Sequence, residues 1–554
     1  MLRETVADLF AAAVRSAQAA GDLPAFDPPA VEVQRPRSAE HGDFATNVAM
    51  QLARPARLAP LRIAEAVARH VAAADFVGAV TVAPPGFINL TLADAWLAGQ
   101  VDAVRAAGAG FADVDLGGGR SLQVEFVSAN PTGPLHVGGA RNAAIGDTLA
   151  RVLEACGWRV QREYYLNDAG SQMAKFGASV YARYCQALGR DVPLPEDGYP
   201  GAYIADYAAR IHTAAGDRFL DVEPDVAARE LGRQAVAAVV DDLEAVLGRI
   251  RCRFDTWFSE QSLYDSGAFE RVMRDLRAQG VTFERDGAEW LATSRFGGDR
   301  DEVLVRSSGQ PGYYASDVAY HHDKFVVRGF DRVVDVWAVD HQNQARRMPF
   351  LMRALGLDPE RLSIVLYDLV KVVEGGAEVK MSKRRGTFIA LEDVLEAIDA
   401  DAVRFMMLTR SNEQVIELDL DLARQQSNDN PVYYVQYGHA RICSILRVAA
   451  ERGLGDFDGG DVARLRHPAE LALVRQMLRL SDVLEKVAAD LAPHHLPHYA
   501  QELARAFHLF YHDCQVVDPA EPDLSRARLK LVDAARIALA RVLDLMGMHA
   551  PEQM

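Results

Sequence analysis

Residues 121–166 read SLQVEFVSANPTGPLHVGGARNAAIGDTLARVLEACGWRVQREYYL, and this stretch determines the architecture of the chain. Leu122, Val124 and Phe126 alternate with other residues, which predicts a strand with one face in a core. A turn rich in proline and glycine follows, then apolar residues at helical spacing, then a second strand over residues 160–166. Strand, glycine turn, helix and strand form a βαβ unit, which is the first half of a nucleotide-binding sheet.

The turn before the predicted helix is suited to a nucleotide. The first N–H groups of a helix and their partial positive charge favour phosphate. Gly138 and Gly139 have no Cβ, so a purine ring or a phosphate can lie on the backbone, and His136 can donate to a phosphate oxygen. The motif alone leaves a second interpretation open, a tight βα turn with a capping histidine.

Length and composition favour a multidomain globular protein. A chain of 554 residues is too long for one core, so we expect three or four domains. The net charge of −17 gives no overall attraction to nucleic acid, which would have to bind at local basic patches. No apolar run is long enough to span a bilayer, and charged residues interrupt the N-terminus where a signal peptide would lie. The five cysteines are far apart without a C-x-x-C pair, which favours reduced thiols in the cytoplasm and argues against zinc or a disulfide framework.

The pattern along the chain predicts three domains. Residues 1–110 are expected to form a small α/β domain, residues 111–425 a doubly wound parallel sheet of the Rossmann type, and residues 426–554 an all-helical domain. A helical insertion is expected at about 170–290, with the second sheet half beginning near Trp290 and residues 302–306 as a strand. Residues 332–339 form a near-continuous apolar run, as expected of a buried parallel strand, and Asp340, His341 and Gln342 follow at the edge that binds ligands.

A second stretch carries concentrated positive charge. Lys380, Met381, Ser382 and Lys383 precede two arginines and follow the flexible residues 374–376. Such a loop can close over a polyphosphate and balance the charge that develops at phosphorus. Alone, it is equally consistent with a solvated basic loop or a nucleic-acid patch. Because the His136 turn occurs in the same chain, we expect the two distant segments to meet over one nucleoside triphosphate.

These two motifs resemble the signatures of class I aminoacyl-tRNA synthetases. His136-Val137-Gly138-Gly139 is similar to the HIGH signature, and residues 380–383 match KMSK. More closely, nearly the whole chain resembles arginyl-tRNA synthetases, in residues 124–138, 165–170, 254–260, 313–317, 380–383, 401–404 and 430–437. The chain departs from the HIGH pattern at Gly139, which replaces the second histidine. We expect backbone N–H groups of the turn to take over the phosphate contact of that histidine.

The resemblance implies the activation of arginine by ATP, with Mg²⁺ accompanying the ATP, and the transfer of arginine to its tRNA. The residues implied at the ATP are His136, Gly138, Gly139, Lys380, Met381, Ser382 and Lys383, with His136, Lys380 and Lys383 as the catalytic groups. Those implied at the arginine are Glu125, Ser128, Asn130, His136, Tyr313, Asp317, His341 and Gln342. No metal site made by the protein alone is expected. A guanidinium calls for carboxylates in planar geometry, which favours Glu125 and Asp317. A surface carboxylate, a helix N-cap and a packed aromatic are the structural alternatives for Glu125, Asp317 and Tyr313.

The helical C-terminal part is the expected tRNA-binding region. Tyr433, Gln436, Tyr437 and Arg441 begin its first helix, and aromatic residues beside arginine are suited to stacking unpaired bases. At helical spacing the same residues can belong to the core. The expected protein is a monomer that binds arginine-specific tRNA, L-arginine and ATP and no membrane. A class I synthetase for another amino acid and a catalytically silent relative, suggested by Gly139, remain the alternatives.

Overall fold

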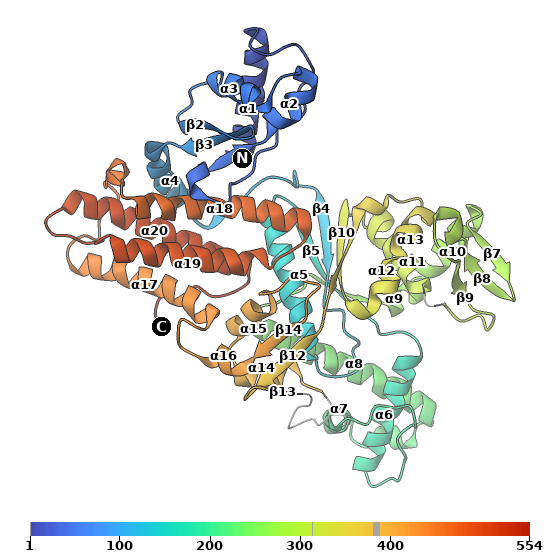
Figure 1. Ribbon diagram of the computed structural model, residues 1–554. Coiled ribbons are helices and arrows are strands. Elements are labelled where there is room, and N and C mark those ends of the chain that lie inside the picture. Colours follow the sequence, from blue (N-terminus) through green and yellow to red (C-terminus); the bar gives the residue numbers. More distant parts are fainter. Residues whose placement is uncertain (1, 313, 380–387) are drawn as a thin grey trace.

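The computed structural model describes residues 2–312, 314–379 and 388–554, and a parallel sheet lies at its centre (Figure 1). Its strands are β4 (Ser121–Glu125), β5 (Arg159–Leu166), β6 (Thr256–Ser259), β10 (Arg332–Ala338) and β11 (Leu362–Tyr367). They run parallel in the order β11-β10-β4-β5-β6, so the direction of winding reverses between β4 and β10. The predicted doubly wound fold is confirmed, and such sheets bind ligands beyond the carboxyl ends of the strands at this reversal.

Helix α5 (Val137–Ala155) joins β4 to β5 and is buried along most of its length. The predicted apolar positions Ile145 and Leu149 lie in the core. Gly146 lets the helix approach the sheet closely, because a Cβ there would lie 2.2 Å from the ring of Phe126. The close packing of α5 on β4 fixes the turn that connects them.

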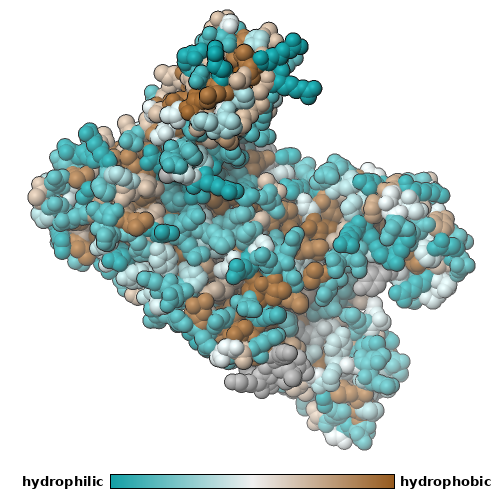
Figure 2. Space-filling model, viewed as in Figure 1, coloured by the Kyte–Doolittle hydropathy of each residue, from teal (hydrophilic) through white to brown (hydrophobic). Residues whose placement is uncertain are grey.

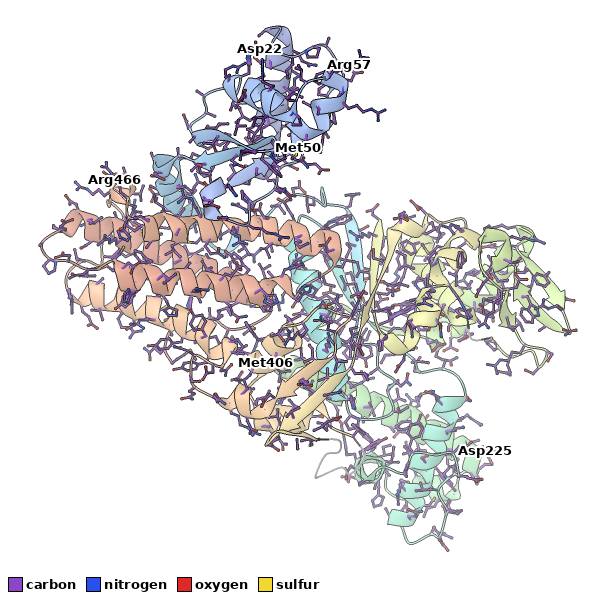
Figure 3. All side chains as sticks on the ribbon, viewed as in Figure 1. Asp22, Met50, Arg57, Asp225, Met406 and Arg466 are labelled. Carbon is purple, nitrogen blue, oxygen red and sulfur yellow. The ribbon has the colours of Figure 1, made fainter. Side chains whose placement is uncertain are left out.

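Two insertions separate the strands of the parallel sheet. The first, between β5 and β6, consists of α6 (Ser171–Ala187), α7 (Ala202–Ala215) and α8 (Pro224–Arg249). It projects as a lobe from the body, and Figure 3 labels Asp225 in it. The second lies between β6 and β10 and contains α9 (Gln261–Asp265), α10 (Ala268–Ala278), β7 (Thr282–Arg285), β8 (Ala288–Leu291), β9 (Glu302–Val305), α11 (Ala315–His322) and a π-helical segment (Asp323–Val327).

This arrangement differs from the single insertion predicted over residues 170–290. Strand β6 returns to the parallel sheet within that range, so the range is divided in two. Strand β9, within the predicted strand at residues 302–306, pairs antiparallel with β8 in a separate sheet of order β7-β8-β9. The second half of the parallel sheet therefore begins at β10 and not near Trp290. An alternating pattern identifies a strand but not the sheet that it joins.

The N-terminal lobe is a small α/β domain, as predicted. It contains α1 (Leu2–Ala19), β1 (Phe44–Thr46), α2 (Val48–Ala56), α3 (Pro60–Arg69), β2 (Val77–Ala83), β3 (Phe87–Leu92) and α4 (Asp94–Ala107), with the antiparallel strand order β1-β3-β2. Ion pairs attach this lobe to the C-terminal helices, including Arg35 with Asp482 at 2.5 Å and Arg105 with Asp533 at 2.8 Å.

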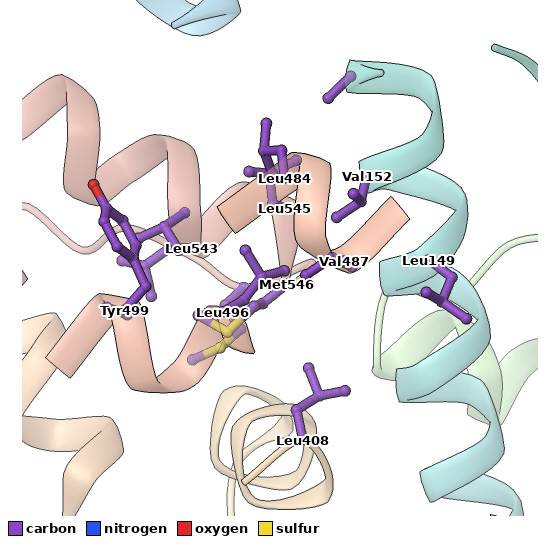
Figure 4. Close-up of a cluster of buried hydrophobic side chains, with 14 of the residues drawn as sticks. Leu149, Val152, Leu408, Leu484, Val487, Leu496, Tyr499, Leu543, Leu545 and Met546 are labelled. Atoms are coloured by element: carbon purple, nitrogen blue, oxygen red, sulfur yellow. The ribbon is translucent and has the colours of Figure 1, made fainter. Parts of the chain in front are cut away.

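The C-terminal half adds a three-stranded sheet and a bundle of long helices. After α12 (Gln342–Ala345) and α13 (Met348–Ala354) come β12 (Val370–Glu374), β13 (Ala377–Val379), α14 (Leu391–Ala397), α15 (Ala400–Met407), β14 (Ile416–Asp419) and α16 (Leu420–Arg424). The bundle consists of α17 (Pro431–Glu451), α18 (Pro468–Asp490), α19 (His495–Asp513) and α20 (Pro522–Leu545). Figure 4 shows Leu149 and Val152 of α5 beside Leu484, Val487 and Leu545 of the bundle, so one hydrophobic core joins α5 to these helices.

The residues Asp401 to Arg404, which resemble the DALR sequence, form a buried junction. The guanidinium of Arg404 is fully buried and donates to the Met546 and Ile250 carbonyls and to the Asp147 carboxylate at 2.6 to 2.8 Å. The Arg404 side chain therefore joins its own segment to three distant parts of the chain, so this sequence stabilises the fold.

The exterior is mostly polar on the face shown in Figure 2, where hydrophilic residues cover most of the C-terminal helices. Within the described ranges, no helix combines the length and the apolar character needed to cross a membrane.

Candidate active site

A cleft of about 1170 Å³ opens at the carboxyl end of the parallel sheet, where β4 and β10 lie side by side. The predicted site residues that line it are Glu125, Ser128, Asn130, His136, Gly138, Gly139, Asp317 and His341. Gln342 is absent from the lining, and Gln344 of α12 is present. Tyr313, Lys380, Met381, Ser382 and Lys383 lie outside the described residues, so their roles stay predictions.

His136 is the N-cap of α5, and one side of its ring is already bonded. Its Nδ1 accepts a hydrogen bond from the Gly138 N–H at 3.0 Å, so the proton of the neutral ring lies on Nε2. Burial lowers the pKa of His136, which keeps the ring neutral near pH 7. The donor that this side chain offers to a phosphate oxygen is therefore Nε2–H.

The first N–H groups of α5 are occupied. Val137 donates to the Ile389 carbonyl, Gly138 donates to the His136 ring, and Gly139 donates to the His136 carbonyl. The expectation that backbone N–H groups of this turn replace the missing histidine is not met in this conformation, because these donors already have acceptors.

Gly139 is closely packed against Leu135. A Cβ at position 139 would lie 2.5 Å from Cδ1 and 2.8 Å from Cγ of Leu135. Leu135 therefore occupies the direction that a histidine side chain would take, and any larger residue here requires Leu135 to move.

The chain that follows the predicted KMSK loop lies directly against the His136 turn. His136 forms a β-bridge with Ala390, and the Leu391 N–H donates to the Leu135 carbonyl at 2.8 Å. The ring of Phe388 lies 5.9 Å from the His136 ring. The two distant segments thus meet at the C-terminal flank of the loop.

A strained turn at the end of β4 places polar groups in the cleft. Val127 and Ser128 have φ angles of 67° and 42°, which non-glycine residues seldom adopt and β-branched residues least of all. The Val127 N–H donates to Asn142 Oδ1 at 2.8 Å. Ser128 Oγ donates to Glu125 Oε1 at 3.0 Å and accepts from the Tyr165 N–H at 3.1 Å. These bonds hold the turn in its strained form.

Glu125 at the floor of the cleft belongs to a buried ion network. The fully buried Lys324 ammonium, in the π-helical segment, donates to Glu125 at 2.7 Å and to Asp335 at 2.8 Å. His321 Nε2 lies 3.0 Å from Asp335. Burial raises the pKa of Glu125 to about 7. For Asp335, Lys324 and His321 outweigh burial and lower the pKa to about 2.

A second pair of carboxylates, Asp317 and Glu260, lines the wall of the cleft. Burial raises the pKa of Glu260 to about 7, and the charge of Asp317 adds to this effect. Burial also raises the pKa of Asp317. Asp317 Oδ2 accepts from Gln344 Nε2 at 2.6 Å. Among the described residues, neither carboxylate forms an ion pair with a lysine or an arginine, and His321 and Lys324 only partly offset the rise in the pKa of Asp317.

His341 and Gln344 support Asp317 from behind. Gln344 uses its Nε2 for Asp317, so its Oε1 is the acceptor, and His341 Nδ1 lies 3.1 Å from that oxygen and donates to it. His341 thereby fixes the orientation of the Gln344 amide, which in turn orients Asp317.

The chain matches known domain families over nearly its whole length. The family described as tRNA synthetases class I (R), catalytic domain, matches residues 107–426. The arginyl tRNA synthetase N terminal domain matches residues 4–92, and the DALR anticodon binding domain matches residues 435–554. The chain belongs to the arginyl-tRNA synthetase family.

Individual relatives agree with this assignment. The chain is 44% identical to the arginine–tRNA ligase of Dehalococcoides mccartyi, over 100% of this chain and 99% of the relative. It is 45% identical to that of Moorella thermoacetica, over 100% of both chains. The structure described as a putative arginyl-tRNA synthetase from Campylobacter jejuni superposes with a TM-score of 0.76 at 31% identity, over 84% of this chain and 100% of that one. The Thermus thermophilus arginyl-tRNA synthetase shares the fold, with a TM-score of 0.77 at 23% identity over 100% of both chains.

The helical C-terminal domain presents a column of stacked side chains. The rings of Tyr433 and Tyr437 stack at 5.6 Å with an interplanar angle of 11°. Arg441 lies 5.9 Å from the Tyr437 ring and 4.5 Å from the ring of Tyr511 on α19. Tyr437, Arg441 and Tyr511 also line a groove of about 920 Å³.

Gln436 requires a correction. This side chain was predicted to contact tRNA, but it is buried, and its amide donates to Asp401 Oδ2 at 2.8 Å and to the His549 carbonyl at 3.1 Å. These two bonds join α17 to the buried junction.

Sequence reasoning missed Glu260, Lys324, Gln344 and Tyr511. Glu260 directly follows β6, and the rule that parallel strands end at the ligand edge could have identified it once residues 256–259 were assigned to that sheet. Lys324 carries no such signal, because a lysine in an amphipathic stretch normally faces water.

Proposed function

We propose that this protein activates L-arginine with ATP and transfers it to the 3′-terminal ribose of arginine-specific tRNA. The observation that carries the proposal is the carboxylate pair Asp317 and Glu260, which forms no direct ion pair with a lysine or an arginine in the described part of the chain, in the same cleft as the His136 turn. A guanidinium is planar, always charged and able to bond two carboxylates at once. A cationic amino acid thus supplies the charge that this wall lacks.

The arginine lies across the cleft with its guanidinium on Asp317 and Glu260. Its α-carboxylate must reach the α-phosphorus of ATP, so the α-ammonium group lies near the β4 turn, where Glu125, Ser128 and Asn130 offer oxygen atoms. His341 acts indirectly in this arrangement, through Gln344 and Asp317.

ATP lies along the His136 turn. His136 Nε2–H donates to a phosphate oxygen, and the nucleotide lies in the cleft that Gly138 and Gly139 line. Lys380 and Lys383 balance the charge at the α-phosphorus, and Met381 and Ser382 complete the loop over it. Mg²⁺ arrives with ATP and is held by phosphate oxygens and water. Among the described residues, no group of three or more His, Cys, Asp or Glu side chains is placed to hold a metal ion.

The reaction needs no nucleophile from the protein. A carboxylate oxygen of arginine attacks the α-phosphorus, pyrophosphate leaves, and arginyl-adenylate forms. A ribose hydroxyl of the tRNA then attacks the adenylate carbonyl and loses its proton, and AMP leaves. Catalysis consists of positioning and charge stabilisation.

The tRNA contacts the helical domain at the column Tyr433, Tyr437, Arg441 and Tyr511, where unpaired bases can stack. The protein works as a monomer in the cytoplasm, which agrees with five thiols that are all free.

ATP–pyrophosphate exchange and tRNA charging, measured with each amino acid in the presence of tRNA, test the proposal. Exchange that depends on arginine alone is the expected result. Exchange with another amino acid in place of arginine, or no exchange and no charging at all, would overturn it.

A further inference from the structure

The helical insertion touches the loop that follows β4 at two points. Asn130 Nδ2 donates to Oε1 of Gln172, the second residue of α6, at 3.1 Å. A Cβ at Gly133 would lie 2.8 Å from the ring of Tyr203 in α7. Both ends of the loop at residues 130–133 are therefore in contact with the insertion.

In the structure, the Gln172 side chain occupies the donor side of the Asn130 amide. An asparagine amide has a donor side and an acceptor side. Because Nδ2 is bonded to Gln172 Oε1, the opposite atom, Oδ1, is left for a ligand, and no described residue donates to it. Asn130 and Gln172 both line the cleft. An amide rotated by half a turn would present its NH₂ group to the cleft, and that group repels an ammonium ion.

The placement of Gln172 suits it to hold this orientation. Its backbone is fixed in the first turn of α6, directly after Gly170, which turns sharply with a φ of 82°. The hydrogen bond from Asn130 to Gln172 of α6 keeps Asn130 Oδ1 in place before any ligand binds, which lowers the entropic cost of binding.

We propose that Gln172 is a positioning residue, which holds the Asn130 oxygen toward the cleft and so strengthens binding of the α-ammonium group of arginine. The inference rests on the proposed function and assigns the insertion a part in recognising the amino acid.

The test compares three variants of the full-length protein in tRNA charging. Gln172→Met keeps the length of the side chain and removes the acceptor. Gln172→Glu keeps only acceptors and so enforces the same Asn130 orientation. Gln186→Met, at the far end of α6, is the matched control. For each, KM and kcat for arginine are measured with the inhibition constant of 5-guanidinopentanoate, which is arginine without its α-amino group.

We expect Gln172→Met to raise the KM for arginine about fivefold, the size of one modest hydrogen bond, with kcat little changed. The inhibition constant of 5-guanidinopentanoate should stay at the wild-type value. Gln172→Glu should restore the KM, and Gln186→Met should match the wild type.

Three outcomes would overturn the inference: an unchanged KM in Gln172→Met, an equal loss of affinity for arginine and for 5-guanidinopentanoate, or failure of Gln172→Glu to restore the KM. Each leaves arginine charging by the wild type intact, whereas absence of that charging would reject the proposed function itself.

Discussion

The floor and the wall of the cleft hold their carboxylates in opposite ways. At the floor, Glu125 and Asp335 share the buried ammonium of Lys324, so the protein provides the counter-charge. At the wall, neither Asp317 nor Glu260 has a lysine or arginine bonded to it among the described residues, and burial raises the pKa of both carboxyls, as it does for Glu125. Both sites are acidic and both contribute to one cleft.

This difference distinguishes carboxylates that stabilise the fold from carboxylates that recognise the substrate. A carboxylate neutralised from inside keeps a fixed position and contributes to folding, because an uncompensated charge in the interior is costly. A carboxylate pair left without a cation is unfavourable until a cation arrives, so its interaction energy appears on binding. The pair at the wall is therefore the specificity element, and the network at the floor holds the surface on which the substrate lies.

The largest expected effect comes from removing one carboxylate charge, that of Asp317, from the wall of the cleft. Asp317→Asn leaves the shape unchanged but deprives the guanidinium of a buried partner, which costs about 4 kcal/mol, or about a thousandfold in kcat/KM for arginine. The thermal stability should stay constant or rise, because the repulsion between the charges of Asp317 and Glu260 disappears. Steady-state charging and thermal unfolding measure the two quantities.

Asp275→Asn, on the exposed surface of α10, is the matched control and should keep wild-type kinetics. An unchanged KM for arginine in Asp317→Asn would remove Asp317 from the substrate site.

Removing the Lys324 charge from the floor of the cleft should lower the stability of the fold. Lys324→Met leaves Glu125 and Asp335 buried without their shared cation, and we expect the free energy of unfolding to fall by about 3 kcal/mol. The double variant Lys324→Met, Glu125→Gln should lose less, because one of the stranded charges is gone. Urea unfolding of the single and double variants measures both values. Equal midpoints for Lys324→Met and the wild type would show that the floor network does not stabilise the fold.

The wall should also make arginine binding depend on pH. Burial raises the pKa of Glu260 to about 7, and a bound guanidinium requires the ionised form. The KM for arginine should therefore fall as pH rises, by about tenfold between about pH 6 and about pH 8. Glu260→Gln should reduce this dependence, with Glu125 still titrating near pH 7 in the same cleft, and should bind arginine more weakly at high pH. A pH-independent KM in the wild type would contradict the assignment of Glu260 to the substrate cation.

The smallest expected effect comes from the packing of Leu135 against Gly139, at the end of the cleft assigned to ATP. Gly139→His should not raise turnover, because Leu135 occupies the space for the new side chain, and strain should lower stability by about 1 kcal/mol. Adding Leu135→Ala frees that space and serves as the control. A faster enzyme from Gly139→His alone would show that the missing histidine, and not the packing, limits the rate.

The sequence predicted those features that depend on local pattern. The turn at residues 136–139 and the apolar run of β10 predicted the doubly wound sheet, because glycine turns and buried strands have distinct sequence patterns. Glu125 and Asp317 line one cleft as predicted, because both follow from the ligand edge of such a sheet and from the charge of a guanidinium.

Features that depend on tertiary contacts could not be predicted in this way. Whether Glu125 is neutralised from inside depends on Lys324, whose burial no local pattern indicates. The sheet joined by residues 302–305 depends on strand pairing far along the chain. Gln436 lies in the same stretch of α17 as Tyr433 and Tyr437. The sequence does not show that its amide bonds to Asp401 in the interior.

Helix α5 has a further mechanical consequence. It is 19 residues long and therefore about 28 Å from end to end, with His136 at its tip and α18 and α20 resting on its flank. This continuous helix connects the bundle directly to the end of the cleft where ATP phosphates are proposed to bind. A displacement of the bundle would therefore also move the imidazole of His136.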